Sequence, residues 1–535
     1  MNSSLHGQSL IGGQPIEKRG RSFHAVSPLD NQPLEPAFHE CALGDVDRAL
    51  ELADKAFDTY SQTTAEDRAA FLERIADEIT ALGDGLLERA HLETGLPLDR
   101  LTGERGRTTG QLRLFASVLR EGSWVDARID TALPERQPIP RPDLRRMLRP
   151  LGPIVVFGSS NFPLAFSVAG GDAASALAAG NPVIIKAHRA HPGTSELVAG
   201  AVNRAVAASG LPPGVFSMLH GSGVEIGTGL VRHPLTRAAG FTGSRVAGRA
   251  LFDAASARPD PIPVFAEMSS LNPIFILPGA LRERSIQIAD GLKTSVTAGV
   301  GQFCTKPGLV FGLGGPSLQS FASALAERIA ATPPATMLHS GIHRAFSEGV
   351  EAMSRIPGVT ALAQSSESAD SARTQAEAFV FTTDTEGFLE NAALHEEVFG
   401  PFSLIIDAPE MADLILAARC LEGQLTATIH GTTEDIAEAG ELISVLERKA
   451  GRLIFNGFPT GVEVCPSMNH GGPYPATTDA RFTSVGTAAI LRWVRPVCYQ
   501  NFPAAALPSE LRDDNPGRIM RLINNTLSRE PLSSL

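Results

Sequence analysis

The sequence predicts an α/β protein built around a parallel sheet, and three observations support this fold class. From Gly152 onward, short apolar runs alternate with turns and helical stretches. The run at 154–157 is apolar throughout, as expected for a strand that is covered on both faces. The first third of the chain has helical periodicity. The expected strands are residues 154–157, 183–186, 215–219 and 238–242.

The expected helices follow from apolar residues three or four positions apart. One such set predicts a helix around residues 46–57, Thr64 with Asp67 opens a second, and a third covers about residues 98–119. Pro163 stands where another helix can begin, because proline fits the first helical turn. The helices expected between the strands cover residues 163–180, 194–208 and 222–232.

Residues 124–150 differ from the helices before them, because prolines recur there among six arginines. A continuous helix is excluded, and we expect an extended excursion from the first domain. A strand near 483–499 is its expected partner, since apolar and polar residues alternate from Ile490 to Val494. Prolines also recur through residues 501–535, which we expect to form a tail on the surface.

Polar side chains stand where the expected strands end, at Ser159–Asn161, Lys186 and Thr242–Ser244. Parallel sheets bind ligands beyond the carboxyl ends of their strands. The sequence therefore predicts a ligand site at this edge of the sheet.

The composition excludes several classes of function. The 535 residues carry 46 basic and 58 acidic side chains, a net charge of −12 without a basic stripe, so we expect no nucleic-acid partner. The five cysteines are far apart and form no Cys/His cluster in sequence, so we expect neither a metal site nor disulfides. No stretch reads as a signal peptide or a membrane span, and we expect a cytoplasmic protein.

Cys304 is the first candidate for chemistry. It lies in the segment G-Q-F-C-T at 301, before the apolar run 309–311. Most such cysteines are inert, but these flanking residues are not typical of a packed core. A nucleophilic thiol needs a lowered pKa or a nearby base. Glu267, at the end of the apolar strand 262–266, is the candidate base, although a carboxylate at a strand end is ordinarily a solvated terminus.

Three further features could serve a site or could be structural only. Gly243 and Gly248 could let a phosphate approach a helix N-terminus, or could simply pack the helix on the sheet. Asn161 could donate to an oxyanion or cap a helix ahead of Pro163. His470 lies in a loop rich in Gly and Pro, of a kind that often lines sites.

Six sequence blocks in this order resemble the aldehyde dehydrogenase superfamily over about residues 10–500. Five of them are N-F-P at 161, N-P-V-I-I-K at 181, F-T-G-S at 241, G-Q-F-C at 301 and E-E-V-F-G-P at 396. The sixth, E-M-S-S-L-N-P at 267, matches the family block Glu-Leu-Gly-Gly-x-Asn/Ser-Pro with Ser269 and Ser270 in place of the glycines.

The resemblance implies a reaction. Cys304 is then the nucleophile whose thiolate adds to the aldehyde carbon, while Asn161 and the Cys304 backbone amide stabilise the oxyanion. Hydride leaves this adduct for a nicotinamide, and Glu267 activates the water that hydrolyses the resulting thioester. An anionic tetrahedral adduct is a better hydride donor than a free aldehyde, so covalent catalysis precedes oxidation.

The same resemblance implies a cofactor site. NAD-preferring relatives often carry Glu three residues after the lysine at 186, where this chain has Arg189. A guanidinium there favours the 2′-phosphate of NADP, so we expect NADP to be preferred, with NAD possible. The residues implied to hold the cofactor are Lys186, Arg189, Gly243, Ser244, Gly248, Glu397 and Phe399.

The fold implied by the resemblance has three parts and a homodimeric or homotetrameric assembly. The parts are a Rossmann-like cofactor domain (1–123 and 151–268), an α/β catalytic domain (269–482) and a small β oligomerisation arm (124–150 and 483–500), followed by a C-terminal tail (501–535).

Within the superfamily, the blocks starting at 186, 469 and 495 are similar to those of 2-oxoglutarate-semialdehyde (2,5-dioxopentanoate) dehydrogenases. Relatives of that branch include bacterial NADP-dependent fatty aldehyde dehydrogenases, so medium- or long-chain aldehydes are the alternative substrates. In this branch His470 lies near the active cysteine and either tunes its pKa or shuttles protons. A CoA-acylating dehydrogenase or a catalytically dead nucleotide-binding protein is disfavoured, because Cys304, Glu267 and Asn161 are all present.

A semialdehyde with a carboxylate at its far end needs a cation to bind it. The helical stretch 107–113 offers Arg107 and Arg113, with Gln111 one turn from Arg107. Ordinary surface salt bridges are the other interpretation of these arginines.

Overall fold

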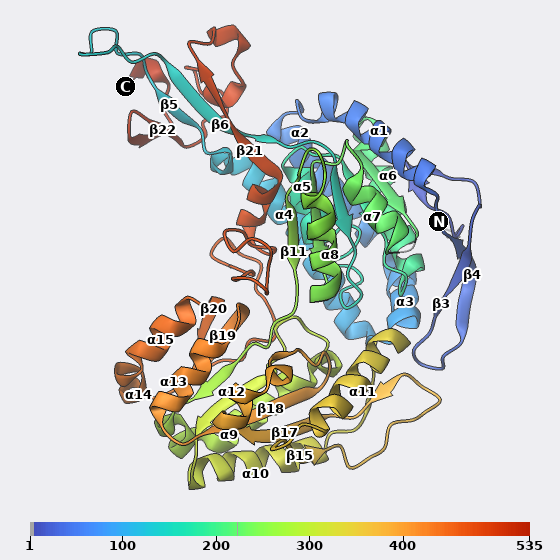
Figure 1. The fold of residues 1–535 in the computed structure, drawn as a ribbon. Helices are drawn as coiled ribbons and strands as arrows, with labels where there is room; N and C mark the ends of the chain where they lie inside the picture. The colour runs from blue at the N-terminus through green and yellow to red at the C-terminus, as the bar shows by residue number, and fades with distance from the viewer. Residues whose placement is uncertain (1–4, 222, 535) are drawn as a thin grey trace.

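The computed structural model describes residues 5–221 and 223–534, and two seven-stranded sheets lie at its centre (Figure 1). The first sheet has the order β11-β10-β7-β8-β9-β1-β2. The strands from β11 to β9 are parallel, as predicted, and β1 with β2 extends the sheet in antiparallel fashion. These strands are β1 (Leu10–Ile11), β2 (Gln14–Pro15), β7 (Ile154–Phe157), β8 (Val183–Lys186), β9 (Phe216–Leu219), β10 (Ala238–Thr242) and β11 (Val264–Glu267).

Helices cover both faces of this sheet. Ile154 and Val156 point into a core with α2, α4, α5 and α6, whereas Val155 and Phe157 point into the opposite core with α1, α7 and α8. This alternation explains why the strand is apolar throughout. The helices are α1 (Leu43–Tyr60), α2 (Ala65–Thr80), α3 (Gly83–Thr94), α4 (Leu98–Glu121), α5 (Gly171–Ala178), α6 (Pro192–Ala208), α7 (Glu225–Arg232) and α8 (Arg245–Ser256).

The helix predicted from Pro163 is wrong in its first half, because α5 begins only at Gly171. Residues 163–170 form turns instead. The buried carboxylate of Glu104 accepts hydrogen bonds from the backbone N–H groups of Leu164 (2.9 Å) and Ala165 (3.0 Å), and this contact from α4 replaces helical bonding there. The predictions at residues 1–4 and 222 lie outside the described residues.

The second sheet lies below the first in Figure 1 and has the order β15-β17-β18-β13-β12-β19-β20. It is parallel except for the β15–β17 pair. Its strands are β12 (Ile274–Ile276), β13 (Leu309–Leu313), β15 (Thr360–Gln364), β17 (Phe379–Asp384), β18 (Phe402–Ala408), β19 (Gln424–His430) and β20 (Ala450–Phe455). Its helices are α9 (Pro278–Thr297), α10 (Pro316–Ala330), α11 (Ser340–Ser354), α12 (Thr385–Glu390), α13 (Met411–Cys420), α14 (Thr433–Glu438) and α15 (Gly440–Glu447).

Two small antiparallel strand pairs and several 3-10 turns complete these layers. The pairs are β3 (Ser22–Val26) with β4 (Pro33–His39), and β14 (Ala335–Thr336) with β16 (Gln375–Ala376). The 3-10 turns are η1 (Ser123–Val125), η2 (Pro213–Val215), η3 (Ala298–Gly301), η4 (Ala392–His395), η5 (Thr487–Trp493), η6 (Ala504–Ala506), η7 (Ser509–Leu511) and η8 (Leu532–Ser534). In the described part of the chain, none of the helices has the length and apolarity needed to cross a bilayer.

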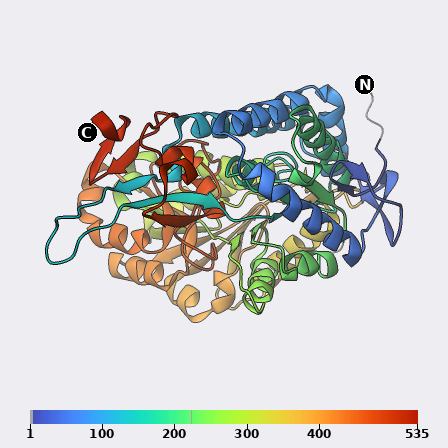
Figure 2. The same cartoon turned by 90° about the horizontal axis from the view of Figure 1, so that it is seen from above.

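A third sheet forms an arm that projects from the first lobe, at the end of the molecule opposite β3 and β4 (Figure 2). The extended excursion predicted at 124–150 is confirmed, since β5 and β6 belong to this sheet. Its strands, in order across the sheet, are β21 (Val494–Gln500), β6 (Leu144–Pro150), β5 (Arg128–Asp130), β22 (Arg521–Ile523) and β23 (Thr526–Ser528).

Two predictions near the C-terminus need correction. The strand expected from residue 483 begins only at Val494, because Arg492 and Trp493 are both buried against α5 and cannot alternate. Arg492 pairs with Asp172 (2.7 Å), and the Trp493 indole N–H donates to Ser175 Oγ (2.8 Å).

The expected surface tail is also wrong, since β22 and β23 add two strands to the arm. Apolar side chains of this segment fill the arm's own core with Val125, Ile129 and Met147. The prolines interrupt regular structure here but do not prevent packing. The buried side chains of the segment are Leu507, Leu511, Ile519 and Ile523.

Candidate active site

Cys304 lies in the loop that joins η3 to β13 of the second sheet. Asn272 holds this loop, because its side-chain amide donates to the carbonyls of Cys304 (2.9 Å) and Lys306 (3.1 Å). Gly301 has φ 64° and lies against Gly400, so closely that a Cβ at 301 would stand 2.2 Å from the Gly400 carbonyl oxygen. The nucleophile loop is therefore fixed on two sides.

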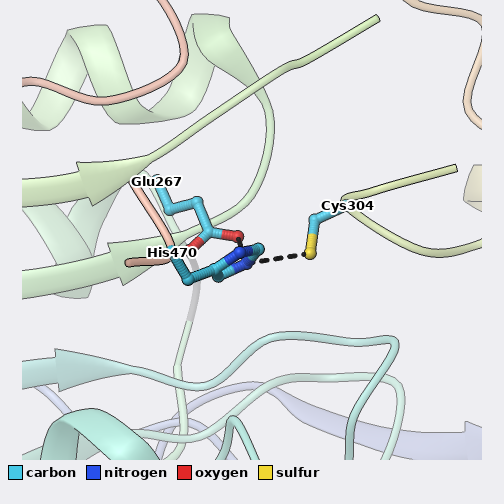
Figure 3. A group of neighbouring side chains, drawn as sticks. All are labelled: Glu267, Cys304 and His470. Atoms are coloured by element: carbon cyan, nitrogen blue, oxygen red, sulfur yellow. Dashed lines mark hydrogen bonds and ion pairs between the residues drawn. The ribbon is translucent and has the colours of Figure 1, made fainter. Parts of the chain in front are cut away.

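The structure brings three of the predicted catalytic side chains into direct contact (Figure 3). His470 Nε2 lies 3.3 Å from Cys304 Sγ and 3.0 Å from Glu267 Oε1. The other Glu267 oxygen accepts a hydrogen bond of 2.6 Å from the Ser484 hydroxyl. Glu267 comes from the end of β11 and His470 from the loop after β20, and both are almost fully buried.

The charges of this trio follow from its surroundings. Burial, and next the Glu267 carboxylate, raise the pKa of the Cys304 thiol well above its usual value. Burial also acts against the Glu267 carboxylate, but His470, Ser484 and Cys304 together hold the pKa of Glu267 below its usual value. The resting site therefore holds a protonated thiol and an ionised carboxylate.

His470 lies where a proton can move between these two groups. A neutral imidazole with its lone pair on Nε2 can accept the thiol proton, and the imidazolium so formed then faces the Glu267 carboxylate. The arrangement can thus generate a thiolate without moving any side chain far.

Asn161 lies beside the nucleophile loop, as predicted. Its side-chain amide donates to the Gln302 carbonyl (3.0 Å), and Arg100 donates to its backbone carbonyl (2.9 Å). The Arg100 guanidinium also stacks on the rings of Phe162 (5.0 Å) and Phe303 (5.1 Å). Arg100, which the sequence did not single out, therefore ties the Asn161 segment to the cysteine segment.

The three predicted substrate residues separate into two groups. Arg107 lies over Phe162 and Phe166, and its Nε and Nη2 atoms are buried without a hydrogen-bond partner. Burial lowers the pKa of Arg107, and its charge acts on Cys304. Gln111 is buried one turn along α4. Arg113 is on the outer face, where it pairs with Asp77 (2.8 Å), so the structure does not bring it to the site.

Two further cations at the site were missed by sequence reasoning. Arg452, on β20, donates to the Pro459 carbonyl (2.8 Å), and its charge also acts on Cys304. Lys306 is fully buried, and its ammonium donates to the carbonyls of Val398 (3.1 Å) and Phe402 (3.0 Å). For Lys306, the only sequence feature that could have indicated its role is its position two residues after Cys304. Nothing in the local sequence indicates a role for Arg452.

The predicted cofactor residues lie mainly at the carboxyl edge of the first sheet. Lys186 ends β8, and burial lowers its pKa to about 8. Its ammonium makes no hydrogen bond or ion pair with the described residues. Arg189 donates to Glu40 (2.9 Å) and stacks on Phe23 (4.5 Å). An unpaired, buried ammonium fits the hydroxyl and phosphate groups of a nucleotide.

Ser244 caps α8, since its hydroxyl accepts from the Ala247 N–H (3.3 Å). The two glycines around it are explained by packing. A Cβ at Gly243 would stand 2.6 Å from the Phe241 ring, and one at Gly248 would stand 2.7 Å from Met268. That Gly243 and Gly248 also let a phosphate approach the helix N-terminus remains a prediction.

Glu397 and Phe399 lie on the loop that Lys306 holds. Burial raises the pKa of Glu397 to about 7, while Lys306 and hydrogen bonds from Ser269 and the Ser270 backbone act in the opposite direction. Ser270 also donates to Asn272 (3.0 Å). The two serines that replace the family's glycines thus contact Glu397 and Asn272, the residue that holds Cys304.

A thiol, an imidazole and a carboxylate in contact, beside the carboxyl edge of a parallel sheet, form the site of a thiol-dependent α/β enzyme. Residues 16–475 match the aldehyde dehydrogenase family. The chain belongs to this family, whose enzymes are oxidoreductases that use NAD or NADP.

Two relatives match almost the whole chain. α-Ketoglutaric semialdehyde dehydrogenase 2 of Azospirillum brasilense is 52% identical over 97% of this chain and 98% of its own length. α-Ketoglutaric semialdehyde dehydrogenase of Acinetobacter baylyi is 48% identical over 98% of this chain and 100% of its own length.

Solved structures of lower identity share the fold. A 1-pyrroline-5-carboxylate dehydrogenase has a TM-score of 0.77 at 21% identity and 92% coverage of both chains. A betaine aldehyde dehydrogenase variant of Staphylococcus aureus with NAD+ has a TM-score of 0.78 at 20% identity, covering 93% of this chain and 97% of its own. The predicted aldehyde dehydrogenase fold is confirmed.

Proposed function

We propose that this enzyme oxidises 2-oxoglutarate (α-ketoglutaric) semialdehyde to 2-oxoglutarate. The observation that carries the proposal is the buried Arg107 guanidinium, two of whose nitrogens lack a partner and whose charge reaches Cys304. A substrate carboxylate would supply the missing acceptors, because guanidinium and carboxylate form paired hydrogen bonds. The two relatives of about half identity carry this activity in their names.

In the proposed mechanism, the Cys304 thiol gives its proton to His470 Nε2, and the thiolate adds to the aldehyde carbon. The Asn161 amide and the Cys304 backbone N–H then stabilise the oxyanion. Lys186, Arg189, Ser244, Glu397 and Phe399 would hold the nicotinamide cofactor, which would supply the hydride acceptor for this step.

The second half-reaction is hydrolysis of the thioester on Cys304. Glu267 is ionised and close to the sulfur, so it can take a proton from the attacking water, and His470 can return a proton to the departing thiolate. A positioned base at the thioester favours water over CoA as the acyl acceptor.

The substrate proposal is tested with Arg107→Gln, using Arg113→Gln as the matched control on the same helix. We expect kcat/KM for the semialdehyde to fall about a hundredfold in Arg107→Gln, because a buried charged hydrogen bond is lost. A neutral aliphatic aldehyde should be oxidised as before by both variants. Equal losses on both aldehydes, or a wild-type preference for a long-chain aldehyde, would refute the carboxylate site.

We also propose that NADP is preferred over NAD. Arg189 is the candidate partner of the 2′-phosphate, and it must then exchange its ion pair with Glu40 for the phosphate. We expect Arg189→Ala to raise the KM for NADP severalfold and to leave that for NAD nearly unchanged. A wild-type kcat/KM at least tenfold higher with NAD would contradict this proposal.

The division of labour along the chain is also a proposal. Residues 1–123 and 151–268 would hold the cofactor and 269–482 the nucleophile. Residues 124–150 and 483–500 would join a homodimer or homotetramer in the cytoplasm.

A further inference from the structure

The contact between Cys304, His470 and Glu267 has a property that the oxidation does not require. One possible ligand atom from each residue, Sγ, Nε2 and a carboxylate oxygen, lies within 4.8 Å of the other two (Figure 3). Thiolate, imidazole and carboxylate are the three side-chain ligands that Zn²⁺ uses. No other group of this kind occurs among residues 5–221 and 223–534.

We propose that this trio binds one Zn²⁺ ion and that the ion switches the enzyme off. The site is regulatory: zinc is an inhibitor here and takes no part in the oxidation. The inhibition, though not the binding, rests on the proposed function of Cys304 as the nucleophile.

The geometry is close to what zinc needs. Bond lengths of about 2.3 Å to sulfur and about 2.05 Å to nitrogen and oxygen place tetrahedral ligands about 3.6 Å (S to N) and about 3.4 Å (N to O) apart. The corresponding distances are 3.3 Å from Cys304 Sγ to His470 Nε2 and 3.0 Å from Nε2 to Glu267 Oε1. These two pairs therefore need to separate by only a few tenths of an ångström, and the third pair, Sγ and the carboxylate oxygen, lies within 4.8 Å.

The charge balance also favours a dication. Binding releases the Cys304 thiol proton to solvent, and His470 binds through its Nε2 lone pair as a neutral ring. The thiolate and the Glu267 carboxylate then carry two negative charges, which the ion neutralises in a buried place. Arg107 and Arg452 oppose the ion, because their positive charges act on Cys304.

The consequence for catalysis is direct. A sulfur bonded to zinc has its lone pair engaged and cannot add to an aldehyde carbon. Three protein ligands leave a fourth position for water. Mg²⁺ prefers oxygen ligands in octahedral geometry, so it should neither bind nor inhibit.

The binding test uses Co²⁺ as a spectroscopic substitute for zinc. The protein is the full chain with the exposed Cys420 and Cys498 changed to serine, freed of metal with a chelator and kept under reducing, oxygen-free conditions. We expect one equivalent of Co²⁺ to produce a thiolate-to-cobalt charge-transfer band in the near ultraviolet, which one equivalent of Zn²⁺ abolishes. Cys304→Ser should remove the band.

A matched pair of variants tests His470 as the second ligand. His470→Gln should weaken Zn²⁺ binding by at least about tenfold, because even the loss of a residue that only orients a ligand weakens metal binding by that much in other metalloproteins. His24→Gln, an exposed histidine far along the chain, should leave binding unchanged. Zinc should also protect Cys304 from iodoacetamide in the wild-type protein.

The proposal is overturned if the band persists in Cys304→Ser, if His470→Gln and His24→Gln bind zinc equally, or if the wild-type chain binds no zinc. These outcomes are distinct from failure of the proposed function. Metal-free enzyme that binds zinc but does not oxidise the semialdehyde would refute the substrate. Enzyme that oxidises it without binding zinc would refute this inference alone.

Discussion

The residues around Cys304 differ in one respect from Lys186 and Arg107, two of the cations proposed to bind the cofactor and the substrate. The first have hydrogen-bond partners in the described part of the chain, and the second leave charged nitrogens without one. Cys304 Sγ, His470 Nε2, both Glu267 oxygens and the Ser484 hydroxyl each already have a partner within the group. Two buried nitrogens of Arg107 have no partner among the described residues, and the Lys186 ammonium makes no hydrogen bond or ion pair with them.

This difference separates two tasks. Groups that move protons must be in place before the substrate arrives, because their geometry sets the rate. Groups that recognise an anion gain most when they remain unpaired until it binds, since a buried unpaired charge is costly and the ligand relieves that cost. Two of the predictions below concern Glu267, a group of the first kind, and the third concerns Lys306, which holds the loop that carries Glu397.

The largest effect should come from Glu267→Gln. We expect the first turnover to persist and the steady-state rate to fall by about a hundredfold to ten-thousandfold, because thioester hydrolysis loses its base. Stopped-flow measurement should show a burst of one equivalent of reduced nicotinamide per active site. An unchanged steady-state rate would mean that Glu267 is not the base.

A smaller effect is expected at Lys306, which contacts neither reacting group. Lys306→Met should raise the KM for the cofactor about tenfold with a smaller change in kcat, because two buried carbonyls of the Glu397–Phe402 loop lose their donor. The exposed Lys55→Met is the control. A fall in kcat at unchanged KM would show instead that Lys306 acts on the cysteine.

The smallest effect concerns the resting thiol. The Glu267 carboxylate disfavours the thiolate and so helps to raise the pKa of Cys304, and Glu267→Gln removes that charge. The alkylation profile of Cys304 should therefore shift to lower pH, with labelling at pH 8 about threefold to tenfold faster. Mass spectrometry of the Cys304 peptide measures this rate, and slower labelling would contradict the assigned charges.

Local patterns were sufficient for the elements that carry the chemistry. The apolar runs predicted the parallel strands, and the sequence blocks predicted that Cys304, Glu267 and Asn161 share one site. His470 was expected near the cysteine, and the structure adds that it also contacts Glu267 through the same nitrogen.

The errors arose where distant contacts decide the local structure. Arg492 lies 320 residues from Asp172 in sequence, and that ion pair turns an apparently alternating segment into a buried 3-10 turn. Glu104, which belongs to α4, likewise binds the backbone of residues 164 and 165, and α5 therefore begins later than predicted. Arg113 lies on the same helix as Arg107. Arg113 nevertheless faces outward, because it pairs with Asp77 on α2.

The close approach of Gly301 to Gly400 has a mechanical consequence. With no room for even a methyl group between the two backbones, and with Lys306 holding Val398 and Phe402 nearby, the segment that carries the sulfur and the segment that carries Glu397 form one rigid piece. If Glu397 binds the nucleotide as proposed, a shift of its segment also shifts the thiol. Redesign of cofactor preference should therefore be confined to Lys186 and Arg189, the proposed contacts of the far end of the nucleotide, where the chain can change without shifting the reacting atom.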